Sequence, residues 1–175
     1  RTRKAVDYLR ANPHRLHLGT IGLDISDTSK IRGVNQTLDL WTGKIDSKFE
    51  HEGVKYKVET VCAPDADCVA SSISLEGGAK DNKPAGNIAV AFSFAYPSGG
   101  HCDDACQWEA DDTLHKTTLE AGKNSAVITR ELDNAVYYIY VSWQGLADIR
   151  QTGQHKIVVR AKGGRLSFTA TFQES

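Results

Sequence analysis

Apolar residues recur at every second position through most of this chain, the spacing that buries one face of a β-strand. The clearest row takes every second residue from Ile88 to Tyr96, and three alanines and a serine occupy the positions between them. Small side chains on that second face predict that another part of the protein packs close against it, and a second sheet would serve. Similar patterns predict strands at residues 14–25, 45–49, 54–60, 69–75, 113–119, 125–132, 135–143, 156–161 and 165–172.

Turn residues separate these strands. His51-Glu52-Gly53 divides two of them, and Gly163-Gly164 predicts a hairpin between the last two. Residues 97–112 and 144–155 lack the alternation and are predicted as loops. One short helix is predicted over residues 2–11, ended by Asn12-Pro13 and packed against the sheet edge.

The pattern as a whole predicts the fold class. Nine to eleven short strands with turns between them are typical of an all-β, antiparallel two-sheet sandwich. We expect residues 1–175 to form a single domain, with the short helix at its N-terminus.

The composition argues against nucleic-acid and membrane partners. The 21 basic and 22 acidic residues nearly cancel, so the chain lacks the charge that nucleic-acid binding requires. No run approaches the roughly 20 apolar residues that span a bilayer, so no membrane partner is expected. The chain has no methionine, even at position 1, which predicts a processed form or an excised piece of a longer protein.

Four cysteines and one sequon favour a secreted glycoprotein. Asn35-Gln36-Thr37 is an N-glycosylation acceptor sequence in a loop-like stretch. Local disulfides are favoured, Cys62 with Cys68 across a hairpin and Cys102 with Cys106 in a small loop, while cross-pairing and free thiols remain open.

Aromatic and basic residues supply the candidate carbohydrate contacts. Trp143 ends a buried strand and is expected in the core, whereas Trp41 could lie in the core or at the rim. Trp108, in an acidic loop, is the best exposed platform for a sugar ring, with a loop anchor as the alternative. His14 and Arg15 belong to the most polar group that a loop would present.

No catalytic residue, metal site or cofactor is predicted. His14 and His17 have no third ligand of suitable type nearby in the sequence, and the aspartates of the 97–112 loop lack calcium-loop spacing. No pair of carboxylates, nucleophile elbow or phosphate-binding glycine loop stands out.

Several segments resemble a known family. The runs Tyr8–Leu23, Gln36–Gly43, Val58–Asp65 and Ala89–Pro97 resemble the N-terminal β-sandwich of six-hairpin glycosidase-like proteins, relatives of glycoside hydrolase family 65. The resemblance implies a galactose-mutarotase-like super-sandwich followed by an (α/α)6 barrel that carries the catalytic carboxylates. It spans essentially the whole chain, but its segments are strands and turns rather than a catalytic signature.

Two functional hypotheses are considered, and only the first depends on the resemblance. The first is a non-catalytic domain of a secreted glycoside hydrolase, which packs on a catalytic domain beyond Ser175 and shapes its substrate cleft. The alternative is a free-standing β-sandwich that binds glycan or assembles with copies of itself, using exposed strand edges or Trp108 and the acidic loop.

Overall fold

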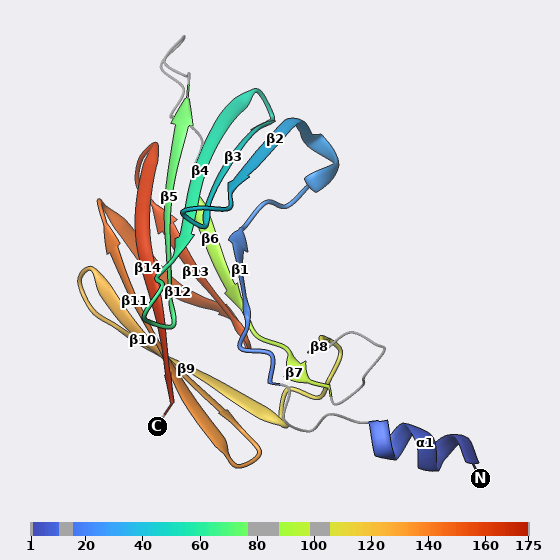
Figure 1. Cartoon of the computed structure of the whole chain (residues 1–175). Helices are drawn as coiled ribbons and strands as arrows, with labels where there is room; N and C mark the ends of the chain where they lie inside the picture. The colour runs from blue at the N-terminus through green and yellow to red at the C-terminus, as the bar shows by residue number, and fades with distance from the viewer. Residues whose placement is uncertain (1, 11–15, 77–87, 99–105, 175) are drawn as a thin grey trace.

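The computed structural model describes residues 2–10, 16–76, 88–98 and 106–174, and these form two antiparallel sheets that pack face to face (Figure 1). The smaller sheet has the strand order β1 (Thr20–Leu23), β6 (Ala89–Ser93), β13 (Lys156–Ala161) and β12 (Ala147–Gly153). The larger sheet has the order β2 (Ile31–Asp39), β3 (Lys44–His51), β4 (Val54–Cys62), β5 (Cys68–Glu76), β14 (Arg165–Glu174), β11 (Ala135–Gln144), β10 (Ser125–Leu132) and β9 (His115–Ala121).

Three small elements complete the described structure. The strands β7 (Tyr96–Pro97) and β8 (Cys106–Gln107) form a ribbon, and a 3-10 turn covers Thr28–Lys30. The N-terminal helix α1 (Thr2–Arg10) lies apart from both sheets (Figure 1). The all-β class, the antiparallel sheets and the short helix are therefore confirmed. The described strands number fourteen rather than nine to eleven.

The core lies between the facing sheets and confirms the clearest sequence pattern. Ile88, Val90, Phe92 and Phe94 are at most 4% exposed and meet the inner faces of β11 and β14. The alanine face of the same strand is also buried, but the larger sheet does not cover it, because that sheet packs on the other face. Ala89 and Ala91 form a small cluster with Val158 instead.

Charged side chains border that alanine face. Lys156 lies opposite Ser93 in the strand register and Arg160 lies opposite Ala89, so both share the face with the alanines. Asp24 holds both head groups, with its carboxylate oxygens 2.7 Å from Lys156 Nζ and 3.6 Å from Arg160 Nη2. Small side chains leave room there for long charged ones.

Three segments differ from the prediction for identifiable reasons. Residues 144–155 are not a loop, since β12 forms there and pairs with β13. Ile149 is the only buried residue of β12, so the strand shows no alternation. Asn35 lies in β2, an edge strand whose residues after Ile31 are all exposed, so it shows no alternation. β13 and β14 do not form a hairpin, because the chain crosses at Gly163-Gly164 from the smaller sheet to the larger one.

The helix also differs from its predicted packing. The side chains of residues 3–10 are all exposed, including Tyr8 at 81% and Leu9 at 80%, so α1 does not pack on the sheet edge. No helix among the described residues has the length and apolar character needed to cross a bilayer.

Candidate groove on the outer face of the large sheet

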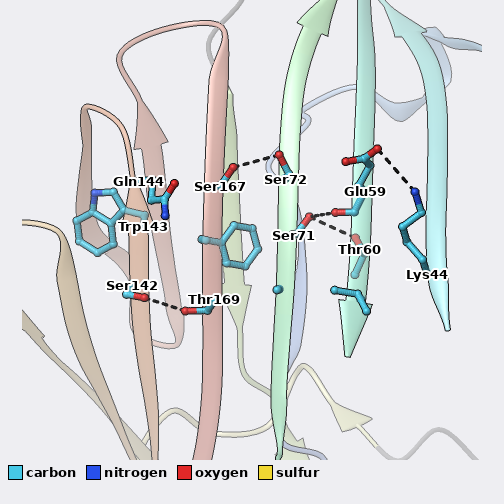
Figure 2. A pocket seen from close by; sticks show the side chains of 13 residues that line it. Lys44, Glu59, Thr60, Ser71, Ser72, Ser142, Trp143, Gln144, Ser167 and Thr169 are labelled. Atoms are coloured by element: carbon cyan, nitrogen blue, oxygen red, sulfur yellow. Dashed lines mark hydrogen bonds and ion pairs between the residues drawn. The ribbon is translucent and has the colours of Figure 1, made fainter. Parts of the chain in front are cut away.

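A groove of about 350 Å³ lies on the outer face of the larger sheet, across strands β4, β5, β14 and β11 (Figure 2). The strand register explains its shape. Ala70 of β5 faces Thr169 of β14, and Ser72 faces Ser167, so four short side chains form a floor. Longer side chains on the flanking strands, among them Glu59 and Gln144, rise on either side of that floor.

Hydroxyl groups on the floor are paired across the strands. Ser72 Oγ lies 3.0 Å from Ser167 Oγ, and Ser142 Oγ lies 2.7 Å from Thr169 Oγ1 (Figure 2). Because a hydroxyl has one donor and two acceptor positions, each pair still has a free O–H and unused lone pairs. The floor can therefore both donate to and accept from a polar ligand.

The charges at the β4 end of the groove neutralise one another. Lys44 Nζ lies 2.9 Å from Asp46 Oδ2 and 3.9 Å from Glu59 Oε1, and Lys57 Nζ lies 3.0 Å from the same Glu59 oxygen. The hydrogen bond with Asp46 raises the pKa of Lys44, and the same bond lowers the pKa of Asp46. Both partners therefore remain charged at neutral pH, and this end presents no net charge.

A second groove of about 470 Å³ continues the first across β10 and β9. Ser142 and Thr169 line both grooves, and Tyr140, 43% exposed, lies beside them. Thr171 of β14 lies opposite Tyr140 of β11, and Glu120 lies at the far end. We call the two together the outer groove.

A separate polar cluster lies inside the sandwich, around Arg130. Its side chain is 1% exposed, and no described carboxylate lies within ion-pair distance. Arg130 Nη2 donates to Nδ1 of His115 at 2.6 Å, while Nη1 donates to Thr117 Oγ1. The guanidinium also lies over the Phe94 ring, 4.9 Å from its centroid. Neutral acceptors and an aromatic face thus stabilise this buried cation.

Neither Trp41 nor Trp108, the two predicted carbohydrate contacts that the structure describes, lines the outer groove. Trp41 is 97% exposed, in the turn between β2 and β3 that ends at Lys44. Trp108 is 50% exposed, and its ring lies edge to face with that of His17, 6.2 Å between centroids. His14 and Arg15 lie outside the described residues. Trp143 is 4% exposed, which confirms its place in the core.

The structure does not form the predicted disulfide between Cys62 and Cys68. Cys62 lies opposite Val69, and Cys68 precedes Val69 on the same strand. Successive side chains on a strand point to opposite faces, so the two thiols point away from each other, and both are free. Cys102 lies outside the described residues, so its pairing with Cys106 stays a prediction. The side chain of Asn35 is exposed, and its glycosylation likewise stays a prediction.

Sequence reasoning missed the outer groove because its residues come from distant strands. The available signal was the outward row of β14, where Ser167, Thr169 and Thr171 alternate with buried residues. Outward positions of β3 and β4 carry lysines and acids instead. A change from long to short side chains between neighbouring strands indicates a groove, but this signal can be recognised only when the order of the strands in the sheet is known.

Comparison with known proteins supports the fold alone. No family model matches the chain, and no curated protein matches it. A solved structure of a candidate kojibiose phosphorylase from the human microbiome matches with a TM-score of 0.51 at 12% sequence identity. The match covers 83% of this chain and 20% of that one, so the chain spans about a fifth of the length of that protein. A β-sandwich of this kind thus occurs within a much larger carbohydrate-active enzyme.

Proposed function

We propose that this chain is a non-catalytic β-sandwich domain of a secreted carbohydrate-active enzyme related to glycoside hydrolase family 65. In this proposal it packs on an (α/α)6 catalytic barrel and shapes the substrate cleft. The observation that carries the proposal is the fold match, in which most of this chain corresponds to a fifth of a candidate phosphorylase.

Exposed apolar side chains support a contact with another domain. Leu40 and Trp41 are 87% and 97% exposed at the turn after β2. Asp39 orders this turn, because it accepts from the Trp41 N–H at 2.9 Å and from Thr42 Oγ1 at 2.9 Å. Neighbouring large apolar residues held outward on an ordered turn are suited to burial in an interface.

The natural reading frame provides the first test. We expect several hundred further residues with paired amphipathic helices after Ser175, and a stop codon directly after it would contradict the proposal. The second test compares the full-length protein with this chain alone, each incubated with disaccharides and inorganic phosphate or water. Turnover is expected only for the full-length protein, and turnover by this chain alone would contradict a non-catalytic role.

The outer groove favours a second candidate function, a free-standing glycan-binding protein. This alternative predicts a reading frame without a catalytic domain. Self-association through strand edges belongs to the same alternative, and sedimentation of the natural protein over a range of concentrations tests it.

A further inference from the structure

We infer that the outer groove binds a linear, uncharged oligosaccharide along its length. The inference deepens the association with carbohydrate proposed above by assigning it to a site and a ligand class. It makes no use of Trp41, Trp108 or the catalytic domain.

The length of the groove suits several sugar rings in a row. Its lining runs from Glu59 on β4, across β5, β14, β11 and β10, to Glu120 on β9. Five strand spacings of about 4.8 Å give a length of about 24 Å. Ser142 and Thr169 line both halves, so the groove is continuous.

The chemistry of the floor suits a polyhydroxylated ligand. The pairs Ser72–Ser167 and Ser142–Thr169 offer free donors and acceptors, and Gln144 adds an amide next to Ser167. Sugar hydroxyls also donate and accept, so they can satisfy such a surface in either direction.

Tyr140 provides the apolar component that sugar binding uses. Tyr140 is 43% exposed and lines the second half of the groove together with Ser142 and Thr169, and its ring lies 6.3 Å from the Tyr138 ring between centroids. An exposed phenol offers a flat apolar face with a polar edge, which suits the C–H face of a pyranose.

The charges of the groove favour an uncharged glycan. Lys44, a cation in its lining, is engaged by Asp46 and Glu59, and Glu120 adds a carboxylate at the opposite end. An acidic glycan would find the Lys44 ammonium group already paired and would be repelled by the Glu120 carboxylate. A protein partner would meet a floor of hydroxyls, whereas the centre of a protein interface is usually apolar.

Titration of the isotope-labelled chain with single glycans tests the inference. The probes are maltohexaose, cellohexaose, isomaltohexaose and laminarihexaose, with a heparin hexasaccharide as the acidic control. We expect one neutral hexasaccharide to shift the amide resonances around Tyr140, Ser142, Ser167 and Thr169, and the acidic one to leave them unchanged.

Matched variants locate the binding site. Tyr140→Ala and Thr169→Val are each expected to weaken binding about fivefold. The first removes the aromatic platform, and the second removes a hydroxyl while keeping a side chain of similar volume. Ala70→Trp should abolish binding by filling the floor without removing any polar group. Thr118→Val is the control, since Thr118 lies opposite Thr129 and outside the lining of the outer groove.

The outcomes separate this inference from the proposed function. Absence of shifts with all four neutral glycans at about 10 mM would overturn it. Tighter binding of the acidic glycan, or binding that Ala70→Trp leaves intact in a folded variant, would overturn it as well. The reading frame after Ser175 decides the proposed function whichever result is obtained.

Discussion

The imidazole rings of His115 and His155 stack inside the sandwich, with centroids 3.6 Å apart and planes inclined by 28°. Nδ1 of His115 accepts from Arg130. Thr117 Oγ1 also accepts from Arg130, so its O–H is free to donate to Nδ1 of His155 at 2.8 Å. In both rings, therefore, Nδ1 accepts a hydrogen bond and carries no proton. Burial, followed by the charge of Arg130, lowers the pKa of His115 to about 4 and lowers that of His155 in the same direction.

This stack predicts that stability is lost in mild acid. The lowered pKa means that the unfolded chain binds more protons than the folded chain between pH 6.5 and about 4. The contribution of His115 to the free energy of unfolding is therefore complete above pH 6.5, and it falls by up to about 3 kcal/mol as the pH drops to about 4. Urea unfolding at pH 7.5, 6 and 5 measures the effect, and equal free energies of unfolding at pH 7.5 and 5 would contradict it.

A second prediction concerns the cause of the lowered pKa. Arg130→Met removes the buried charge, so the pKa of His115 should rise above about 4 while burial keeps it below 6.5. Arg160→Met is the control, because that guanidinium lies on the opposite face of the smaller sheet, near Asp24. Proton NMR titration of the His115 ring gives both values. The same pKa in Arg130→Met and the unmodified protein would show that the charge is not a cause.

Much of the fold follows from local pattern, and its exceptions have a common cause. The row from Ile88 to Phe94 was predictable, because burial of one strand face leaves a period of two. The strands β12 and β2 were not predictable, because their mostly polar residues are kept in place by pairing with a neighbouring strand and not by burial of one face. The Gly163-Gly164 turn is equally compatible with a hairpin and with a crossing between sheets, so the choice depended on the packing of distant strands.

The sites depend still more on tertiary structure. Arg130 occupies an inward position beside Ile128 and Leu132, which the alternation alone assigns to an apolar residue. Its partners His115 and His155 lie 15 and 25 residues away along the chain. The outer groove joins Ser72 to Ser167, 95 residues apart. No local spacing in the sequence could bring these groups together.

A third prediction tests the packing of the N-terminal segment on the core. Gly19 has a φ of 126°, and a Cβ built there would lie 2.7 Å from Cδ1 of Phe94. Phe94 is 4% exposed and lies against Arg130, so it has little room to move. We expect Gly19→Ala to lower the free energy of unfolding by about 2 kcal/mol.

The matched control for this prediction is Gly22→Ala in the adjoining strand β1. A Cβ at Gly22 would have no neighbouring atom within 4 Å, so the change should stay within about 0.5 kcal/mol. Urea unfolding of the two variants under one set of conditions makes the comparison. Equal effects of the two substitutions would mean that Gly19 does not approach Phe94 in solution.

The last prediction concerns the thiols at the turn between β4 and β5. Cys62 is exposed, and Cys68 points to the other face of the sheet, so the folded protein should not link them. Iodoacetamide should therefore label Cys62 in the native, unreduced protein, as peptide mass spectrometry would show. Cys62→Ser should change stability by no more than about 0.5 kcal/mol, whereas loss of a disulfide would cost about 2 to 4 kcal/mol. A Cys62–Cys68 linked peptide, or the larger loss of stability, would mean that the register of the β4–β5 hairpin differs in solution.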